Sequence, residues 1–204
     1  MSKQKKPHHF QVKDPYYWEA KKQRFRARSA FKLMEIDDQH HIIKAGMTVL
    51  DLASAPGSFL QVLARRVGPD GKVFGADIQE IKPLGKKNVF VTVGDVFQRE
   101  TIDALLLKHD IKQVDLITSD IAPNTTGMTG VDQYRSIELN LAILDIADTY
   151  LKPHANLLLK VFVGEDVNDL IGPIKAKYKT LRRCKPEACR DRSFEEYFLC
   201  LDKK

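Results

Sequence analysis

Lys160 is a charged residue inside an otherwise apolar run, residues 157–163 (LLLKVFV). A run of this kind predicts a strand that is buried on both faces. An unpaired ammonium is costly there, so either its pKa falls or an anionic partner lies close by. The alternative is a lysine at the end of the sheet whose ammonium reaches solvent. Because its pKa can be tuned, a buried lysine suits proton handling better than an arginine does.

Three further residues have the types that complete a charged site. Asp120 follows the predicted strand 114–118, at the edge of the sheet where open α/β folds place their ligands. Glu195 and Glu196 open the last predicted strand, and the alternation of side chains turns one inward and the other to solvent. Lys32 closes the basic N-terminal segment, residues 1–32. Each has an ordinary interpretation as part of a surface ion pair, but together these groups can converge on one cleft.

A loop of small residues at 49–59 (VLDLASAPGSF) is a candidate cofactor site. It has the pattern of a strand, a tight turn and a helix start, which lets a ligand approach the backbone and free N–H groups. The G-x-G-x-x-G fingerprint is absent, which disfavours a nicotinamide or flavin cofactor. Asp77 and Asp95 end the next two predicted strands, where a carboxylate can accept hydrogen bonds from ribose or adenine. Either aspartate alone is explained as a turn residue, but the two together favour cofactor binding.

Strands and helices alternate after Gly46 and position these residues. This alternation predicts an α/β fold with a mainly parallel sheet and helices on both faces. The last two strands are joined by a connection too short for a crossover helix, so we expect an antiparallel hairpin. A seven-stranded sheet that ends in this way is typical of Rossmann-like methyltransferases. The predicted strands are 48–52, 72–76, 89–93, 114–118, 156–163, 180–184 and 197–201, and the predicted helices are 15–22 (capped by Asp14), 29–39, 58–67, 100–109, 133–151 and 166–178.

Positive charge is concentrated in two segments of a chain whose formal net charge is +6. Residues 1–32 carry ten basic side chains against two acidic ones, and residues 175–192 carry eight against two. The rest of the chain is acidic on balance, so this distribution indicates a polyanion-binding surface. A solvated basic tail explains residues 3–6 equally well, but Phe25 and Phe31 interleave the later charges and should dock that stretch on the domain.

The length of 204 residues allows one domain, with 43% hydrophobic and 29% charged residues. We divide the chain into a basic N-terminal extension at 1–27, disordered over its first ten or so residues and in contact with RNA, and a catalytic domain at 28–204. No apolar stretch is long enough to span a membrane, and the N-terminus has no secretory h-region. Three cysteines without a C-x-x-C spacing argue against a disulfide framework or a bound metal and favour a cytoplasmic protein. A monomer is expected.

Five segments of the chain, in this order, resemble the motifs of the FtsJ-type ribosomal RNA ribose methyltransferases. The resemblance covers about nine-tenths of the chain. The segments are 26–36 (RARSAFKLMEI), 51–59 (DLASAPGSF), 119–127 (SDIAPNTTG), 160–165 (KVFVGE) and 193–197 (SFEEY).

The resemblance implies a methyl transfer from S-adenosylmethionine to the 2′-hydroxyl of a uridine in 23S ribosomal RNA of the large subunit. It implies a catalytic tetrad of Lys32, Asp120, Lys160 and Glu195. In the cofactor loop the family has glycine where this chain has Ala53 and Ser58, so we expect weaker cofactor binding. The cofactor-binding residues that the resemblance implies are Ala53, Pro56, Gly57, Phe59, Asp77, Asp95 and Asp120.

In the mechanism that we expect, Lys160 activates the acceptor hydroxyl, which is a poor nucleophile at neutral pH. Asp120 tunes Lys160 and aligns the methyl donor, while Lys32 and Glu195 orient the ribose. Three alternatives stay open at this point. They are a related enzyme acting on tRNA, a methyltransferase for small molecules or bases on the same fold, and a non-catalytic RNA-binding or ribosome-assembly protein. The N-P-P-Y type of motif found in amino-methylating enzymes is absent, which disfavours the second.

Overall fold

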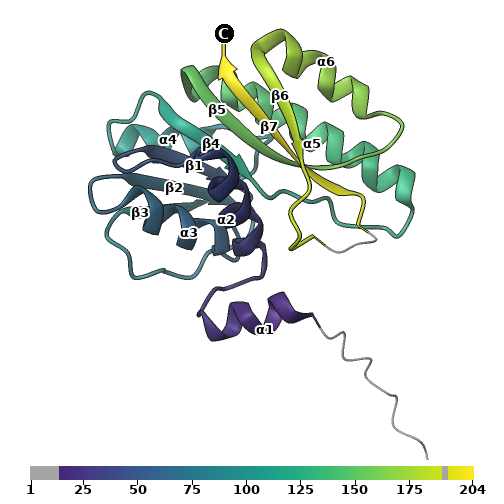
Figure 1. Cartoon of the computed structure of the whole chain (residues 1–204). Coiled ribbons are helices and arrows are strands. Elements are labelled where there is room, and N and C mark those ends of the chain that lie inside the picture. Colours follow the sequence, from purple (N-terminus) through teal and green to yellow (C-terminus); the bar gives the residue numbers. More distant parts are fainter. Residues whose placement is uncertain (1–13, 190–192) are drawn as a thin grey trace, which may run out of the picture.

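The computed structural model describes residues 14–189 and 193–204, which form a seven-stranded sheet with helices on both faces (Figure 1). The strand order is β3-β2-β1-β4-β5-β7-β6. The strands from β3 to β5 are parallel, whereas β7 pairs antiparallel with both β5 and β6. The predicted fold class and its terminal antiparallel hairpin are therefore confirmed.

The element bounds follow the predicted pattern closely. The helices are α1 Pro15–Lys22, α2 Ser29–His40, α3 Ser58–Val67, α4 Glu100–Lys108, α5 Thr129–Tyr150 and α6 Val167–Lys177. The strands are β1 Thr48–Leu52, β2 Lys72–Asp77, β3 Val89–Val93, β4 Val114–Ser119, β5 Leu151–Phe162, β6 Tyr178–Cys184 and β7 Glu195–Lys203.

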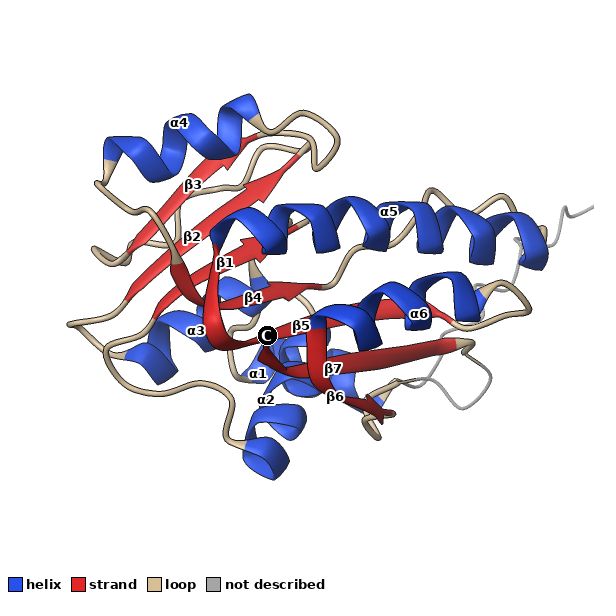
Figure 2. Cartoon of the chain, turned by 90° about the horizontal axis from the view of Figure 1, so that it is seen from above, coloured by secondary structure: helices blue, strands red, loops and turns tan. Residues whose placement is uncertain are grey.

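Two hydrophobic clusters lie on opposite faces of the sheet. Helices α1, α2 and α3 cover one face, and α4, α5 and α6 cover the other (Figure 2). Strand β5 contributes to both, because Leu158 belongs to the first cluster while Leu157 and Leu159 belong to the second. This alternation confirms that the apolar run around Lys160 is a strand buried on both faces.

The largest difference from the predicted elements is the start of β5, which is Leu151 rather than residue 156. The sequence Lys152-Pro153-His154 has the composition of a turn, and His154 does have a positive φ of 63°. The strand nevertheless continues through it, because the register with β4 shifts there and accommodates the irregularity. A local turn signal is thus overridden by pairing with the neighbouring strand.

The N-terminal segment is docked on the domain from Asp14 onward, whereas the stretch expected to be disordered lies outside the described residues. Asp14 caps α1 by accepting from the Tyr17 backbone N–H, as its position before Pro15 predicts. Ala20 and Phe25 are buried in the same cluster as α2 and α3. Among the residues that the structure describes, no helix has the length and apolar character needed to cross a membrane.

Candidate active site

The register of the sheet brings four predicted site residues to one edge. In the parallel register, Ser119 of β4 lies between Leu52 of β1 and Leu159 of β5. The next residues along these strands are Ala53, Asp120 and Lys160, which therefore lie side by side. Asp77 ends β2 one position beyond its alignment with β1. This is the carboxyl edge of the parallel strands, where the chain order reverses and ligands bind in folds of this type.

Lys160 is paired with Asp120 and only 7% exposed. Its Nζ donates to the backbone oxygen of Asp120 at 2.6 Å and lies 3.2 Å from the carboxylate Oδ1. The expected anionic partner is therefore present, and the ammonium is not simply extended into solvent. Two of its three N–H donors can be used on Asp120, which leaves one for a ligand.

Tyr197 of β7 contacts both Lys160 of β5 and Asp120 at the end of β4. It stands opposite Lys160 in the antiparallel pairing of β5 and β7, and its hydroxyl donates to Asp120 Oδ1 at 2.5 Å. Burial raises the pKa of Tyr197 well above its usual value, and the charges of Asp120 and Glu195 raise it further. The phenol therefore stays protonated and acts as a fixed donor to Asp120.

A second ion pair joins the buried Lys32 of α2 to the partly buried Glu195 of β7. Lys32 is 6% exposed, and its Nζ lies 5.9 Å from the centroid of the Tyr197 ring. Glu196 turns the other way and accepts from Arg183 Nε at 2.7 Å. The predicted alternation at the start of this strand is confirmed, with Glu195 as the inward residue. All four tetrad residues thus gather around Tyr197.

A cavity of about 350 Å³ opens beside Asp120. Four of the predicted cofactor residues line it, namely Ala53, Asp77, Asp95 and Asp120. Asp77 and Asp95 hold their own turns by accepting from the backbone N–H groups of Gln79 and Phe97, and Asp77 also accepts from Ala55 in the cofactor loop. The same two carboxylates therefore stabilise turns and line the cavity. Each retains free lone pairs that can accept hydrogen bonds from a ligand.

Asp51, the last but one residue of β1, is a buried carboxylate beneath the cofactor loop. Thr118 donates to its Oδ1 at 2.6 Å, while Oδ2 is buried with no hydrogen-bond partner among the described residues. Burial raises the pKa of Asp51 to about 8. Asp77, Asp95 and Asp120 make the cavity acidic, and an acidic cavity fits S-adenosylmethionine, which carries a sulfonium and an ammonium, better than it fits a polyphosphate.

The two departures in the cofactor loop have distinct structural consequences. Ala53 has a φ of 58°, in the left-handed region that glycine adopts without strain, so a side chain is accommodated here at a cost. Ser58 is the first residue of α3, and its Oγ lies 2.8 Å from Ser29 Oγ. It therefore ties the cofactor loop to the start of the helix that carries Lys32.

Arg26 holds the cofactor loop against the segment that follows β2. Its guanidinium donates to the backbone oxygens of Pro56 at 2.8 Å, Lys82 at 2.6 Å and Pro83 at 2.7 Å. Its backbone N–H donates to Gln61 Oε1 at 2.8 Å. The planar guanidinium spreads its N–H donors over two terminal nitrogens, so Nη1 reaches Pro56 and Lys82 while Nη2 reaches Pro83.

Three other predicted cofactor residues support the cavity without lining it. The Pro56 carbonyl accepts from Arg26, and Gly57, with a φ of 104°, would bring an added Cβ to 3.0 Å from Arg26 Nη1. Phe59 is 2% exposed and stacks on Tyr197 with ring centroids 6.4 Å apart. Phe59 therefore packs between the cofactor loop and the tetrad instead of forming a wall of the cavity.

Four residues around the site were not singled out from the sequence. Arg26, Asp51 and Tyr197 lie within the motifs that resemble the family. The motifs give their positions, but their contacts depend on the fold. Cys189 donates its Sγ–H to Glu195 Oε1 at 3.2 Å, and burial raises its pKa to about 12, so it stays a thiol. No sequence signal distinguishes this cysteine from the other two.

The FtsJ-like methyltransferase family matches residues 25–203 of the chain. The chain is 37% identical over 191 residues to "Ribosomal RNA large subunit methyltransferase E" of Methanobrevibacter smithii, covering 94% of this chain and 90% of that protein. It is 40% identical over 191 residues to the protein of the same name from Hydrogenovibrio crunogenus, with 94% and 92% covered.

Solved structures of methyltransferases resemble the structure of this chain. The structure resembles a ribosomal RNA methyltransferase from Plasmodium falciparum with a TM-score of 0.78 and 27% identity, covering 88% of this chain and 98% of that one. Fibrillarin from Aeropyrum pernix, crystallised with S-adenosyl-L-methionine, has a TM-score of 0.58 and 16% identity, with 85% and 73% covered. The second comparison concerns the fold alone.

Proposed function

This chain belongs to the FtsJ-like methyltransferase family, and from that membership we propose that it methylates the 2′-hydroxyl of a uridine in ribosomal RNA of the large subunit. The observation that carries the proposal is the pair of buried lysine–carboxylate contacts, Lys160–Asp120 and Lys32–Glu195, joined through Tyr197 beside the cavity.

S-adenosylmethionine, held by the acidic cavity, supplies an electrophilic methyl group on a sulfonium. The acceptor hydroxyl would receive this methyl group in place of its proton, which would pass to solvent water. Lys160 lowers the barrier by donating its remaining N–H to the oxygen on which negative charge develops. Asp120 and Tyr197 hold that ammonium in place, so little reorganisation is needed at the moment of reaction.

Lys32 and Glu195 orient the ribose from the α2 side of the cleft in this proposal. Their ion pair is buried and borders Tyr197, so the position of either group depends on the other. The basic segments then hold the RNA phosphates, and binding weakens as salt rises. Because one chain supplies the whole site, we propose a monomer that acts on the large subunit in the cytoplasm.

Labelled methyl transfer tests this proposal directly. Large ribosomal subunits from a host that lacks the homologous enzyme are incubated with the full chain and labelled S-adenosylmethionine, and the RNA is digested to nucleosides. We expect label in 2′-O-methyluridine. Label in a methylated base, or in tRNA alone under the same conditions, would reject the proposed acceptor. A folded protein that binds S-adenosylmethionine but labels no RNA would contradict the reaction itself.

A further inference from the structure

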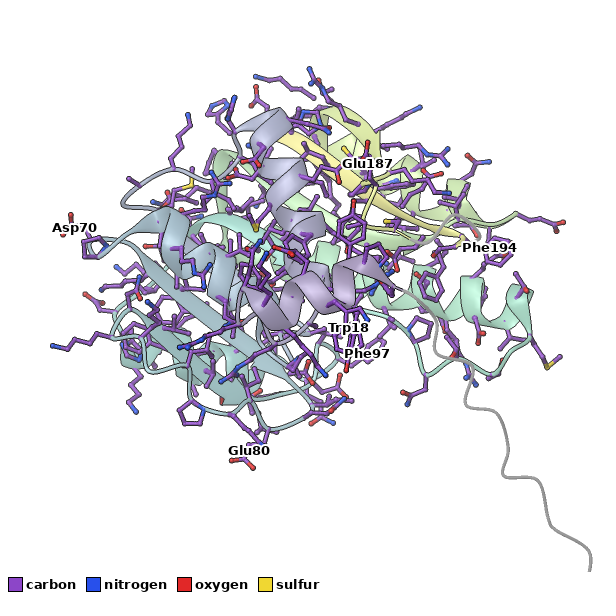
Figure 3. All side chains as sticks on the ribbon, turned by 60° about the horizontal axis from the view of Figure 1, so that its bottom comes forward. Trp18, Asp70, Glu80, Phe97, Glu187 and Phe194 are labelled. Atoms are coloured by element: carbon purple, nitrogen blue, oxygen red, sulfur yellow. The ribbon has the colours of Figure 1, made fainter. Side chains whose placement is uncertain are left out.

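Helix α1 presents two large aromatic side chains to solvent. Trp18 is 59% exposed and Tyr17 is 47% exposed, and their rings meet edge to face with centroids 5.3 Å apart (Figure 3 labels Trp18). Lys21 lies one helical turn on, with its Nζ 4.6 Å from the Tyr17 centroid and 5.1 Å from the Trp18 centroid. The spacing of three and four residues places all three on one face of the helix. We call Tyr17, Trp18 and Lys21 the α1 aromatic face.

The exposure of this face is not the result of a loosely attached helix. The opposite side of α1 is anchored by Ala20, which is 3% exposed, and by Tyr16, whose ring centroid lies 5.7 Å from that of Phe31. Asp14 at the start of the helix pairs with Arg28 just before α2. The aromatic pair is therefore held outward by a docked helix, and its exposed area is a fixed feature of the surface.

The surroundings of the α1 aromatic face are cationic. Within the described part of the chain, Lys21 and Arg24 have no carboxylate partner, and Glu19 lies 4.0 Å from Lys22. Aromatic rings interleaved with cations match the chemistry of single-stranded nucleic acid, whose bases stack on the rings while its phosphates meet the charges. An apolar protein partner would match the rings but not these charges.

The same face is tied to the rim of the active site. The segment after α1 carries Arg26, which donates to the Pro56 carbonyl of the cofactor loop, and then leads into α2, which carries Lys32. A nucleotide stacked on Trp18 would thus be bound by the same rigid unit that positions the tetrad. We propose that an unpaired base of the RNA substrate stacks on the α1 aromatic face. In the RNA strand, this base is adjacent to the segment that enters the cleft. This inference rests on the proposed function, because it takes RNA as the substrate.

Trp18 is the single tryptophan of the chain, so its fluorescence reports this position alone. The full-length protein, without S-adenosylmethionine, is titrated with a short uridine-rich RNA single strand. Stacking predicts saturable quenching of the Trp18 emission with the same midpoint as binding measured by the anisotropy of labelled RNA. RNA that binds in a salt-dependent manner without any change in Trp18 emission would overturn the inference.

Substitutions separate stacking from electrostatic attraction. Trp18→Leu should weaken RNA binding about tenfold while leaving the slope of log Kd against log salt unchanged. Lys21→Gln should reduce that slope by about 0.7, the effect of one phosphate contact on single strands. Leu107→Ala and Lys108→Gln, on α4 at the other face of the sheet, serve as matched controls and should change neither quantity. Circular dichroism melting verifies that each variant is folded.

The result is independent of the methylation assay, so the two proposals can fail separately. Quenching and a Trp18→Leu defect without any methyl transfer would support the stacking face and reject the proposed reaction. Methyl transfer with unchanged Trp18 emission, and with an RNA affinity of Trp18→Leu within about twofold of the parent, would support the proposed reaction and reject the stacking face. A change of Trp18 emission with protein concentration alone would assign the face to a second copy of the chain and overturn the inference.

Discussion

The two halves of the active-site edge are built on different physical principles. The half that we propose binds the cofactor (the cofactor half), at the ends of β1, β2 and β3, is a cavity shaped by backbone turns, small residues and the carboxylates of Asp77 and Asp95. The half that we propose binds the acceptor ribose (the acceptor half), at the ends of β4 and β5 and the start of β7, is a network of buried and partly buried charges around Tyr197. In the first half the loop geometry determines what fits, and in the second the pairing of strands determines which charges meet.

This difference predicts how each half responds to substitution. In the cofactor half, a change alters the shape of a loop and tunes cofactor affinity by modest amounts. In the acceptor half, the removal of one charge leaves its partner buried and unpaired, which costs more than the pair itself contributes. Stability should therefore be lost mainly on the acceptor side and affinity mainly on the cofactor side. Asp51 lies beneath the cofactor loop but is a buried titratable group, as the side chains of the acceptor half are, so it tests the boundary between the two.

The largest effect is expected for Glu195→Ala, which leaves the buried Lys32 without its carboxylate. We expect the free energy of unfolding to fall by about 3 kcal/mol, measured by urea denaturation. The matched control is Glu196→Ala, since this neighbour pairs with the half-exposed Arg183 on the other face of the strand and should lose less than about 1 kcal/mol. Equal losses in the two variants would remove the distinction between the halves.

The pH dependence of Asp51 gives the next effect. Burial raises its pKa from 3.8 to about 8, so between pH 5 and 7 the folded protein binds a proton that the unfolded chain does not. Stability must therefore fall as the pH rises through this range, by about 1.4 kcal/mol per pH unit from this group. Asp51→Asn lacks this contribution, so its stability relative to the parent should increase from pH 5 to pH 7. Parallel profiles in urea denaturation would show that Asp51 is not buried as described.

Arg26→Lys sharpens the comparison on the cofactor side. The variant keeps the charge but loses the fork that reaches the carbonyls of Pro56, Lys82 and Pro83. We expect the affinity for S-adenosylmethionine, measured by calorimetry, to fall about tenfold, or about 1.4 kcal/mol, with little change in the rate at saturating cofactor. Lys22→Ala, an exposed basic residue of the same segment, should leave the affinity unchanged. A loss of rate without a loss of affinity would place Arg26 in the acceptor half instead.

The smallest effect is expected for Ala53→Gly. Relief of the positive φ of 58° should stabilise the protein by roughly 1 kcal/mol and improve S-adenosylmethionine affinity a few-fold. Ala55→Gly serves as the control, because it removes a methyl group from the same loop at a residue without a positive φ and should be neutral or destabilising. If the two variants behave alike, the strain at Ala53 does not limit cofactor binding.

The sequence was most informative where the pattern is periodic or the chemistry is unusual. Lys160 in an apolar strand predicted a buried cation with an anionic partner, and Asp120 is that partner. The alternation of strands and helices predicted the parallel sheet and its antiparallel end. These features follow from burial and from the period of the side chains, which are local properties of the chain.

What the sequence could not provide depends on distant contacts. The hydrogen bond from Tyr197 to Asp120 joins residues 77 positions apart, and the contact of Arg26 with Lys82 and Pro83 crosses 56 and 57 positions. The start of β5 was placed too late because the turn signal at Pro153 is overridden by pairing with β4. Phe59 was predicted from its motif to bind the cofactor, but its stacking on Tyr197 joins residues far apart in the chain and could not be predicted.

The central claim is that Lys160, held by Asp120 and Tyr197, activates the acceptor hydroxyl. It is tested most directly by single-turnover methyl transfer with Lys160→Ala alongside the parent, with S-adenosylmethionine affinity measured in parallel. We predict a rate about a thousandfold lower, with the cofactor affinity within about twofold of the parent. A variant that transfers methyl groups at the normal rate would contradict the claim.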